Sequence, residues 1–286
     1  MYLEQINEPA DVKKLNVEQL NELAAEMRKA LLQKLSKNGG HFGPNLGMVE
    51  ATIALHYVFN SPTDKIVFDV GHQAYAHKII TGRREAFRKN RMKDGISGFP
   101  KRSESEYDAF GVGHSSTSIS AALGFAEAAR QQGLSQKVVA LIGDGSLTGG
   151  LAFEGLNNAG ARKADMLVIL NDNNISIDKN IGGLHNYLLR ITTNPRYNKA
   201  KKQIWDSMGD GWARKAVQRF VTTTKSHLVS GSGGALFQAM GFRYFGPIDG
   251  NDIAQVVDTL KKLKEIKGPI LLHSLTKKGK GYAPAE

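Results

Sequence analysis

The stretch Lys137–Gly145, KVVALIGDG, decides the expected fold. Its apolar, β-branched run is typical of a central parallel strand that is buried on both faces, and it ends in a Gly-Asp-Gly turn at 143–145. A second apolar run at 165–170 ends in a polar turn of the sequence Asn-Asp-Asn-Asn at 171–174. The sequence therefore predicts two buried strands, each followed by a polar turn.

Further apolar runs alternate with helical patterns on both sides of this stretch. We expect strands at 65–70 and 269–274, helices at 16–37, 49–59 and 119–131, and a glycine-rich turn at 41–47. Helical spacing of apolar residues and a capping Asn16 support the first helix. The alternation predicts an α/β fold, a doubly wound and mostly parallel sheet with helices on both faces. Such sheets bind ligands beyond the carboxyl ends of their strands.

Residues 184–232 interrupt the alternation. This segment holds both tryptophans of the chain, many basic residues and glycine punctuation, but weak strand signals. We expect a mobile helical insertion on the surface of a single domain that spans residues 1–286. The basic stretch 190–219 within it is interpreted as solvated surface rather than as a phosphate site.

Composition narrows the class of protein. Of the 286 residues 41% are apolar, which is enough for a core, and cysteine is absent, which excludes disulfides, thiolate metal sites and a cysteine nucleophile. No apolar run reaches the roughly 18 residues of a membrane span, and the first residues lack a signal-peptide core. A cytoplasmic protein is expected. The net charge of +11 is spread widely, without zinc-finger spacing or an RNA-binding aromatic signature, so nucleic acid is not the expected partner.

The two polar turns have the ligand types of a magnesium site. Asp144 offers a carboxylate oxygen and Asn173 an amide oxygen, which suit Mg²⁺ together with diphosphate oxygens. The flanking glycines let the backbone approach an anion, and a helix after Ser146 would point its free amide groups at it. A Gly-Asp-Gly alone is a common turn, but the preceding strand and the second polar turn favour a metal–diphosphate site.

Three histidines, His41, His72 and His114, lie in or beside glycine-rich turns. Histidine titrates near neutral pH and can move protons to and from a carbonyl oxygen. The alternative is that all three are surface or capping residues. Lys277 and Lys278 could each contact a phosphate or lie on the surface, and the sequence favours neither interpretation.

The Gly-Asp-Gly turn that closes with Asn173 resembles the thiamine-diphosphate motif of the transketolase superfamily. Its surroundings are similar to the 1-deoxy-D-xylulose-5-phosphate synthase family. The similar segments are 69–75, 77–79, 81–84, 105–108, 113–118, 246–250 and 276–282. They extend over most of the chain outside 184–232.

The resemblance implies thiamine diphosphate and Mg²⁺ as cofactors and assigns roles to individual residues. The implied metal ligands are Asp144, Asn173 and the Ile175 carbonyl. The implied cofactor contacts are His72, Gly113, His114, Ser115, Gly145, Ser146, Asn173 and Tyr282. The implied catalytic residues are His41, His72 and His114, although Pro44-Asn45 beside His41 departs from the small residues expected there.

The resemblance also implies a reaction. Pyruvate is decarboxylated and condensed with glyceraldehyde 3-phosphate to give 1-deoxy-D-xylulose 5-phosphate, a precursor of isoprenoids, thiamine and pyridoxal. The family's catalytic glutamate and phosphate-binding arginines lie in pyrimidine-binding and C-terminal domains that this sequence lacks, so a separate chain with those domains, or a homo-oligomer, is expected. The alternatives are a subunit of a split transketolase-like enzyme and a non-catalytic thiamine-diphosphate-binding module. A nucleic-acid-binding protein would explain none of the motifs.

Overall fold

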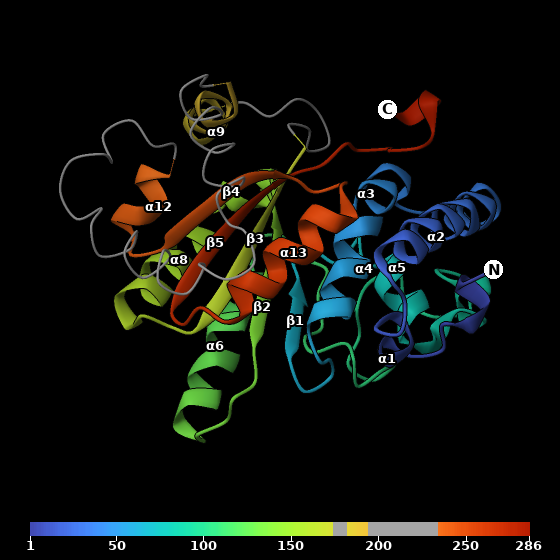
Figure 1. The fold of residues 1–286 in the computed structure, drawn as a ribbon, viewed down its shortest axis with the longest axis horizontal. Helices are drawn as coiled ribbons and strands as arrows, with labels where there is room; N and C mark the ends of the chain where they lie inside the picture. The colour runs from blue at the N-terminus through green and yellow to red at the C-terminus, as the bar shows by residue number, and fades with distance from the viewer. Residues whose placement is uncertain (174–181, 194–233) are drawn as a thin grey trace.

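A single five-stranded sheet forms the centre of the computed structural model, which describes residues 1–173, 182–193 and 234–286 (Figure 1). The strands are β1 (Lys65–Phe68), β2 (Val138–Gly143), β3 (Met166–Asp172), β4 (Arg243–Asp249) and β5 (Pro269–Leu275). They are ordered β1-β2-β3-β5-β4, and each neighbouring pair is parallel. The predicted α/β fold with a parallel sheet is confirmed.

Helices cover both faces of the sheet. The α-helices are α1 (Pro9–Val12), α2 (Val17–Asn38), α3 (Phe42–Gly47), α4 (Val49–Val58), α5 (Tyr75–Lys78), α6 (Ser118–Gln131), α7 (Asp144–Leu147), α8 (Gly150–Arg162), α9 (Gly183–Thr193), α12 (Ala235–Ala239) and α13 (Ile253–Lys264). Short 3-10 or π turns are η1 (Leu3–Gln5), η2 (Ile79–Arg83), η3 (Ala86–Lys89) and η5 (Ala283–Ala285). Asn16 caps α2 as predicted, because its side chain accepts from the Gln19 amide at 2.9 Å.

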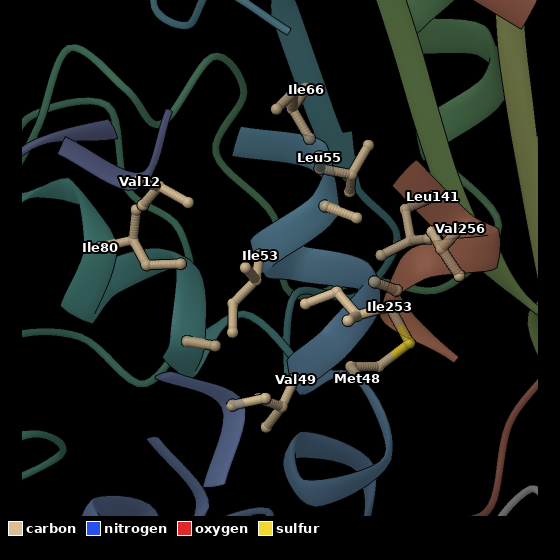
Figure 2. Packing of buried hydrophobic residues seen from close by; sticks show 14 of the residues in the cluster. Val12, Met48, Val49, Ile53, Leu55, Ile66, Ile80, Leu141, Ile253 and Val256 are labelled. Atoms are coloured by element: carbon tan, nitrogen blue, oxygen red, sulfur yellow. The ribbon is translucent and has the colours of Figure 1, made fainter. Parts of the chain in front are cut away.

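Alternate side chains of each strand enter two separate cores. In β2, Val139 and Leu141 join the core under α2, α4 and α13, whereas Ala140 and Ile142 join the core under α6 and α8. Figure 2 shows Leu141 beside Ile253 and Val256 of α13 in the first core. Each large side chain buried in this way contributes roughly 1.5–3 kcal/mol to stability. The two-faced burial explains why the strands read as continuous apolar runs.

The carboxyl ends of all five strands share one edge of the sheet, because the strands are parallel. The register pairs Gly143 of β2 with Asn171 of β3. The next residues along the two strands, Asp144 and Asp172, therefore come side by side. Asp172 is in turn paired with Leu275, so the segment after β5 leaves the sheet at the same edge.

Several local expectations were wrong or incomplete. Residues 42–47 form helix α3 rather than a turn, and the helix expected after Ser146 is divided into one turn, α7, and a longer helix, α8. Gly149 separates the two with extended backbone, φ −72° and ψ 142°. Strand β4 and helix α13 were not predicted. β4 is an edge strand interrupted by Pro247, with a register shift between Phe245 and Ile248 that hides the strand pattern.

Of the expected insertion at 184–232, residues 184–193 lie in helix α9, and 194–232 lie outside the described residues. In the part of the chain that the structure describes, no helix combines the length and apolar character needed to cross a membrane. The single-domain assignment of residues 1–286 stays a prediction.

Candidate functional site

Two buried carboxyl groups meet at the ends of β2 and β3. Asp144 is the first residue of α7 and is 6% exposed, and Asp172 is the last residue of β3 and is 1% exposed. Burial, followed by the charge and hydrogen bond of Asp172, raises the pKa of Asp144 to about 7. Asp144 therefore keeps its proton to a higher pH than an ordinary carboxyl group, because a second negative charge beside Asp172 is unfavourable in this buried position.

Asp172 also contacts a buried histidine. His273 of β5, fully buried, places Nε2 2.8 Å from Asp172 Oδ2. Its Nδ1 lies 2.7 Å from the Tyr244 hydroxyl of β4. The hydrogen-bonded line Tyr244–His273–Asp172 was not predicted from the sequence. Asp172 lies in the polar turn at 171–174, but nothing in the sequence links it to a histidine about a hundred residues away.

The predicted metal ligands are only partly described. Asn173 follows Asp172 directly and is half-buried, so it lies at the same strand end as Asp144. Ile175 lies outside the described residues. Among the described residues no group of three or more His, Cys, Asp or Glu side chains could hold a metal ion. The predicted set contains a single such residue, Asp144, and otherwise uses amide and carbonyl oxygens.

A network of hydrogen bonds joins the 113–118 loop to the Gly-Asp-Gly turn. Asp69, just after β1, accepts from the amides of Ser116 at 2.8 Å and Ser118 at 3.0 Å. Ser116 Oγ donates to the Ser146 carbonyl at 2.7 Å. A Cβ at Gly149 would lie 2.2 Å from Ser116 Oγ, so glycine is required there for this close approach. Asp69 thus holds one wall of the site against the strand ends.

The exposed part of this loop carries three of the predicted cofactor contacts, Gly113, His114 and Ser115. Thr117 Oγ1 donates to the His114 carbonyl at 3.2 Å, which fixes the backbone there. In the part of the chain that the structure describes, no ring contact joins His114 to the other two candidate histidines. The polar groups of this loop are open to a ligand.

The structure brings His41 and His72 together. Their ring centroids are 5.4 Å apart, edge to face, and His41 Nδ1 lies 3.3 Å from the Tyr75 hydroxyl. Asn45, fully buried, holds both segments. Its Nδ2 donates to the His41 carbonyl at 2.6 Å and to the His72 carbonyl at 2.7 Å, while its Oδ1 accepts from the Tyr75 amide at 2.9 Å. The departure from small residues noted in the sequence is therefore a structural link between the two histidines.

His72 is held in its neutral form. Burial, aided by the charges of His41 and Lys278, lowers the pKa of His72 to about 4 against the opposing effect of Asp69. Its Nδ1 is buried without a hydrogen-bond partner among the described residues. An unpaired buried polar atom costs about 1–3 kcal/mol. A ligand atom that meets this nitrogen would recover that energy.

The segment after β5 connects the acidic pair to the histidines. The Thr276 amide donates to the Asp172 carbonyl at 3.0 Å, and the Gly279 amide donates to the Gly43 carbonyl at 2.9 Å. The Tyr282 ring packs edge to face on Phe42 at 5.2 Å. The two lysines left open by the sequence behave differently: Lys277 pairs with Glu286, and Lys278 lies near enough to His72 to lower its pKa.

The fold of the chain is the fold of solved transketolases. The solved transketolase from Campylobacter jejuni matches with a TM-score of 0.69 and 23% identity over 93% of this chain and 39% of that one. The transketolase from Leishmania mexicana matches with a TM-score of 0.63 and 19% identity over 93% and 37% of the two chains. At these identities the likeness establishes the fold.

The sequence comparison is more specific. A family model described as 1-deoxy-D-xylulose-5-phosphate synthase matches residues 3–276, and the chain belongs to this family. The synthase of Chlorobaculum tepidum is 52% identical over 290 residues, covering 99% of this chain and 45% of the relative. That of Thioalkalivibrio sulfidiphilus is 53% identical over 287 residues, covering 99% and 44%. The chain thus spans a little under half the length of these relatives, and the resemblance inferred from the motifs is confirmed.

Proposed function

We propose that this chain is the diphosphate-binding part of a thiamine-diphosphate- and Mg²⁺-dependent 1-deoxy-D-xylulose-5-phosphate synthase. The observation that carries the proposal is the buried pair Asp144 and Asp172 at the ends of adjacent strands. Two ionised carboxyl groups in a buried site repel each other. The repulsion is relieved when one of them is protonated or when a cation binds beside them. A divalent cation bound to a diphosphate supplies that charge.

In this proposal Asp144, Asn173 and the Ile175 carbonyl bind Mg²⁺. Carboxylate, amide and carbonyl oxygens are the hard ligands that Mg²⁺ takes, with diphosphate oxygens completing the shell. Burial of Asp144 supports the assignment, because a buried carboxylate is stable only when its charge is compensated. Gly145 and Ser146 contact the diphosphate from the first turn of α7.

The rest of the cofactor lies along the loops at the same edge. His72, Gly113, His114, Ser115 and Tyr282 line its pocket. When bound, thiamine diphosphate supplies carbanion stabilisation, and the protein binds and orients it. The unpaired Nδ1 of His72 supports this arrangement, because a ligand atom is the partner that the described residues do not provide.

The substrates proposed are pyruvate and glyceraldehyde 3-phosphate. His41, His72 and His114 bind the reacting carbonyl oxygens and exchange protons with them. His72 acts as a neutral imidazole, since its pKa is near 4 and the ring carries no charge at neutral pH. His41 and His72 work as a pair, because Asn45 fixes the backbone of both.

The chain spans 45% of the length of the Chlorobaculum tepidum relative, and we place the second half of the site in pyrimidine-binding and C-terminal domains outside these 286 residues. The proposal includes a cytoplasmic location, because a chain without cysteine needs no oxidising compartment. Turnover requires both halves, since residues of this chain bind the diphosphate while the aminopyrimidine ring is activated elsewhere.

An assay of the purified chain, with and without the protein that supplies the second half, tests the proposal. We expect release of CO₂ from pyruvate and formation of 1-deoxy-D-xylulose 5-phosphate only when both halves are present with Mg²⁺ and thiamine diphosphate. Transfer of two-carbon units between sugar phosphates would instead indicate a split transketolase-like enzyme. Binding of the cofactor without turnover in any combination would indicate a non-catalytic module.

A further inference from the structure

Three side chains form a hydrogen-bonded line across β4, β5 and β3 that ends at the candidate cation site. The Tyr244 hydroxyl lies 2.7 Å from His273 Nδ1, and His273 Nε2 lies 2.8 Å from Asp172 Oδ2. His273 and Asp172 are 0% and 1% exposed. None of the three belongs to the set that the family resemblance assigned.

The direction of these hydrogen bonds follows from the chemistry of the groups. When Asp172 is ionised its oxygens only accept, so the donor of this hydrogen bond is the N–H at His273 Nε2. Nδ1 is then an acceptor and takes its hydrogen bond from the Tyr244 hydroxyl. Tyr244 therefore fixes the tautomer of His273, and His273 fixes one oxygen of Asp172.

Tyr244 is itself held in place by packing. Its ring stacks on Phe237 of α12, with centroids 5.7 Å apart and planes 3° from parallel. The backbone of Gly234, just before α12, is also so close that a Cβ there would lie 2.5 Å from the Tyr244 ring. These contacts hold the ring in the position from which its hydroxyl meets His273 Nδ1.

We propose that His273, oriented by Tyr244, is a positioning residue for the divalent-cation site. It holds the Asp172 carboxyl against Asp144, and Asp172 in turn holds the Asp144 carboxyl where the cation binds. The inference rests on the proposed function, since it assumes that Asp144 is a metal ligand. Residues that hydrogen-bond to a metal-binding side chain set the orientation and the basicity of that side chain.

A second buried histidine–aspartate pair in the same chain provides a contrast. His77 Nε2 lies 2.9 Å from Asp108 Oδ1, and both side chains are buried. Asp108 also accepts from Arg83 and from the Lys101 amide, which compensates its charge within the fold. Asp172 instead faces a second carboxyl group, Asp144. The charge of Asp108 in the His77–Asp108 pair is compensated within the fold, whereas the His273–Asp172 pair adjoins the proposed cation site.

The test measures the Mg²⁺ concentration that gives half-maximal binding of thiamine diphosphate, by calorimetry on the complete protein in the assembly that binds the cofactor. The variants are His273→Asn and Tyr244→Phe, with His77→Asn as the matched control, and thermal unfolding without ligand is recorded for each. We expect His273→Asn to raise the Mg²⁺ requirement about tenfold or more and Tyr244→Phe to raise it less. His77→Asn lowers the unfolding temperature but leaves the Mg²⁺ requirement unchanged.

An unchanged Mg²⁺ requirement in His273→Asn and Tyr244→Phe overturns the inference, as does an equal rise in His77→Asn. If His273→Asn does not fold, Tyr244→Phe decides, because it removes one oxygen and leaves the stacked ring in place. A different result would contradict the proposed function itself: the wild-type protein would bind no thiamine diphosphate at any Mg²⁺ concentration.

Discussion

Replacing Asp144 by asparagine should stabilise the metal-free chain at alkaline pH while abolishing its response to Mg²⁺. In the folded chain the pKa of Asp144 is raised from 3.8 to about 7 by burial and by Asp172. The folded state therefore binds the proton more tightly than the unfolded state. The stability that this proton provides is complete below about pH 4, declines as the pH rises, and is lost above about pH 7.

The size of the effect follows from the shift. Three pKa units correspond to about 4 kcal/mol, as an upper limit for a carboxyl pair that can relax. The asparagine side chain of the variant carries no charge, so the variant lacks this pH dependence. The difference in unfolding free energy between Asp144→Asn and wild type should grow in favour of the variant by about 2 to 3 kcal/mol between pH 5 and pH 8.

Urea denaturation in EDTA at pH 5 and pH 8 measures both free energies. Mg²⁺ with thiamine diphosphate is then added at pH 8, where it should stabilise the wild type and leave Asp144→Asn unaffected. Glu154→Gln, on α8 outside the strand-end contacts, serves as the control and should follow the wild type. The reasoning is refuted if Asp144→Asn is less stable than wild type at pH 8 without metal, or if both proteins show the same pH dependence.

Three further outcomes are expected. Asn45→Ala removes the side-chain hydrogen bonds to the Tyr75 amide and to the His41 and His72 carbonyls. It should cost about 2–4 kcal/mol in urea unfolding and lower turnover of the assembled enzyme, and unchanged turnover would contradict its role beside the histidines. Asp69→Asn loses charge-assisted acceptance from the 113–118 loop, and should cost about 1–3 kcal/mol and weaken cofactor binding, whereas equal affinity in calorimetry would disprove the link. The ¹H–¹⁵N signals of His72 should titrate near pH 4 rather than near 6.5, and a midpoint above pH 6 would show that the ring is not held neutral.

The strands that carry the site were predictable because burial on both faces leaves an unbroken apolar run. Lys137–Ile142 and 165–170 both end in polar turns, and parallel pairing then brings the turns together without further information. Strand β4 was not predicted because Pro247 interrupts its pattern, which an edge strand tolerates. The sequence does carry a signal for helix α13, because Asp252 caps it ahead of apolar residues at helical spacing.

The sequence predicts the two turns that form the candidate site, but it does not predict the side chains that hold those turns and the histidines in place. Asp144 and Asn173 could be expected to lie close together because each follows a buried strand, and parallel pairing of these two strands brings their ends to the same edge. His273 lies within an apolar strand, where its sequence gives no indication of a partner on β3. Asn45 likewise gains its meaning from carbonyls that only the folded chain brings within reach. Long-range hydrogen bonds of this kind depend on register and crossover, which residue patterns do not specify.

The most direct test of the central claim is calorimetry of thiamine diphosphate binding to the wild-type protein and to Asp144→Ala, each with Mg²⁺ and with EDTA. If Asp144 holds the diphosphate through Mg²⁺, the wild type binds only when Mg²⁺ is present, and Asp144→Ala shows no binding in either condition. Binding to Asp144→Ala with the affinity of the wild type would contradict the assignment of the metal site.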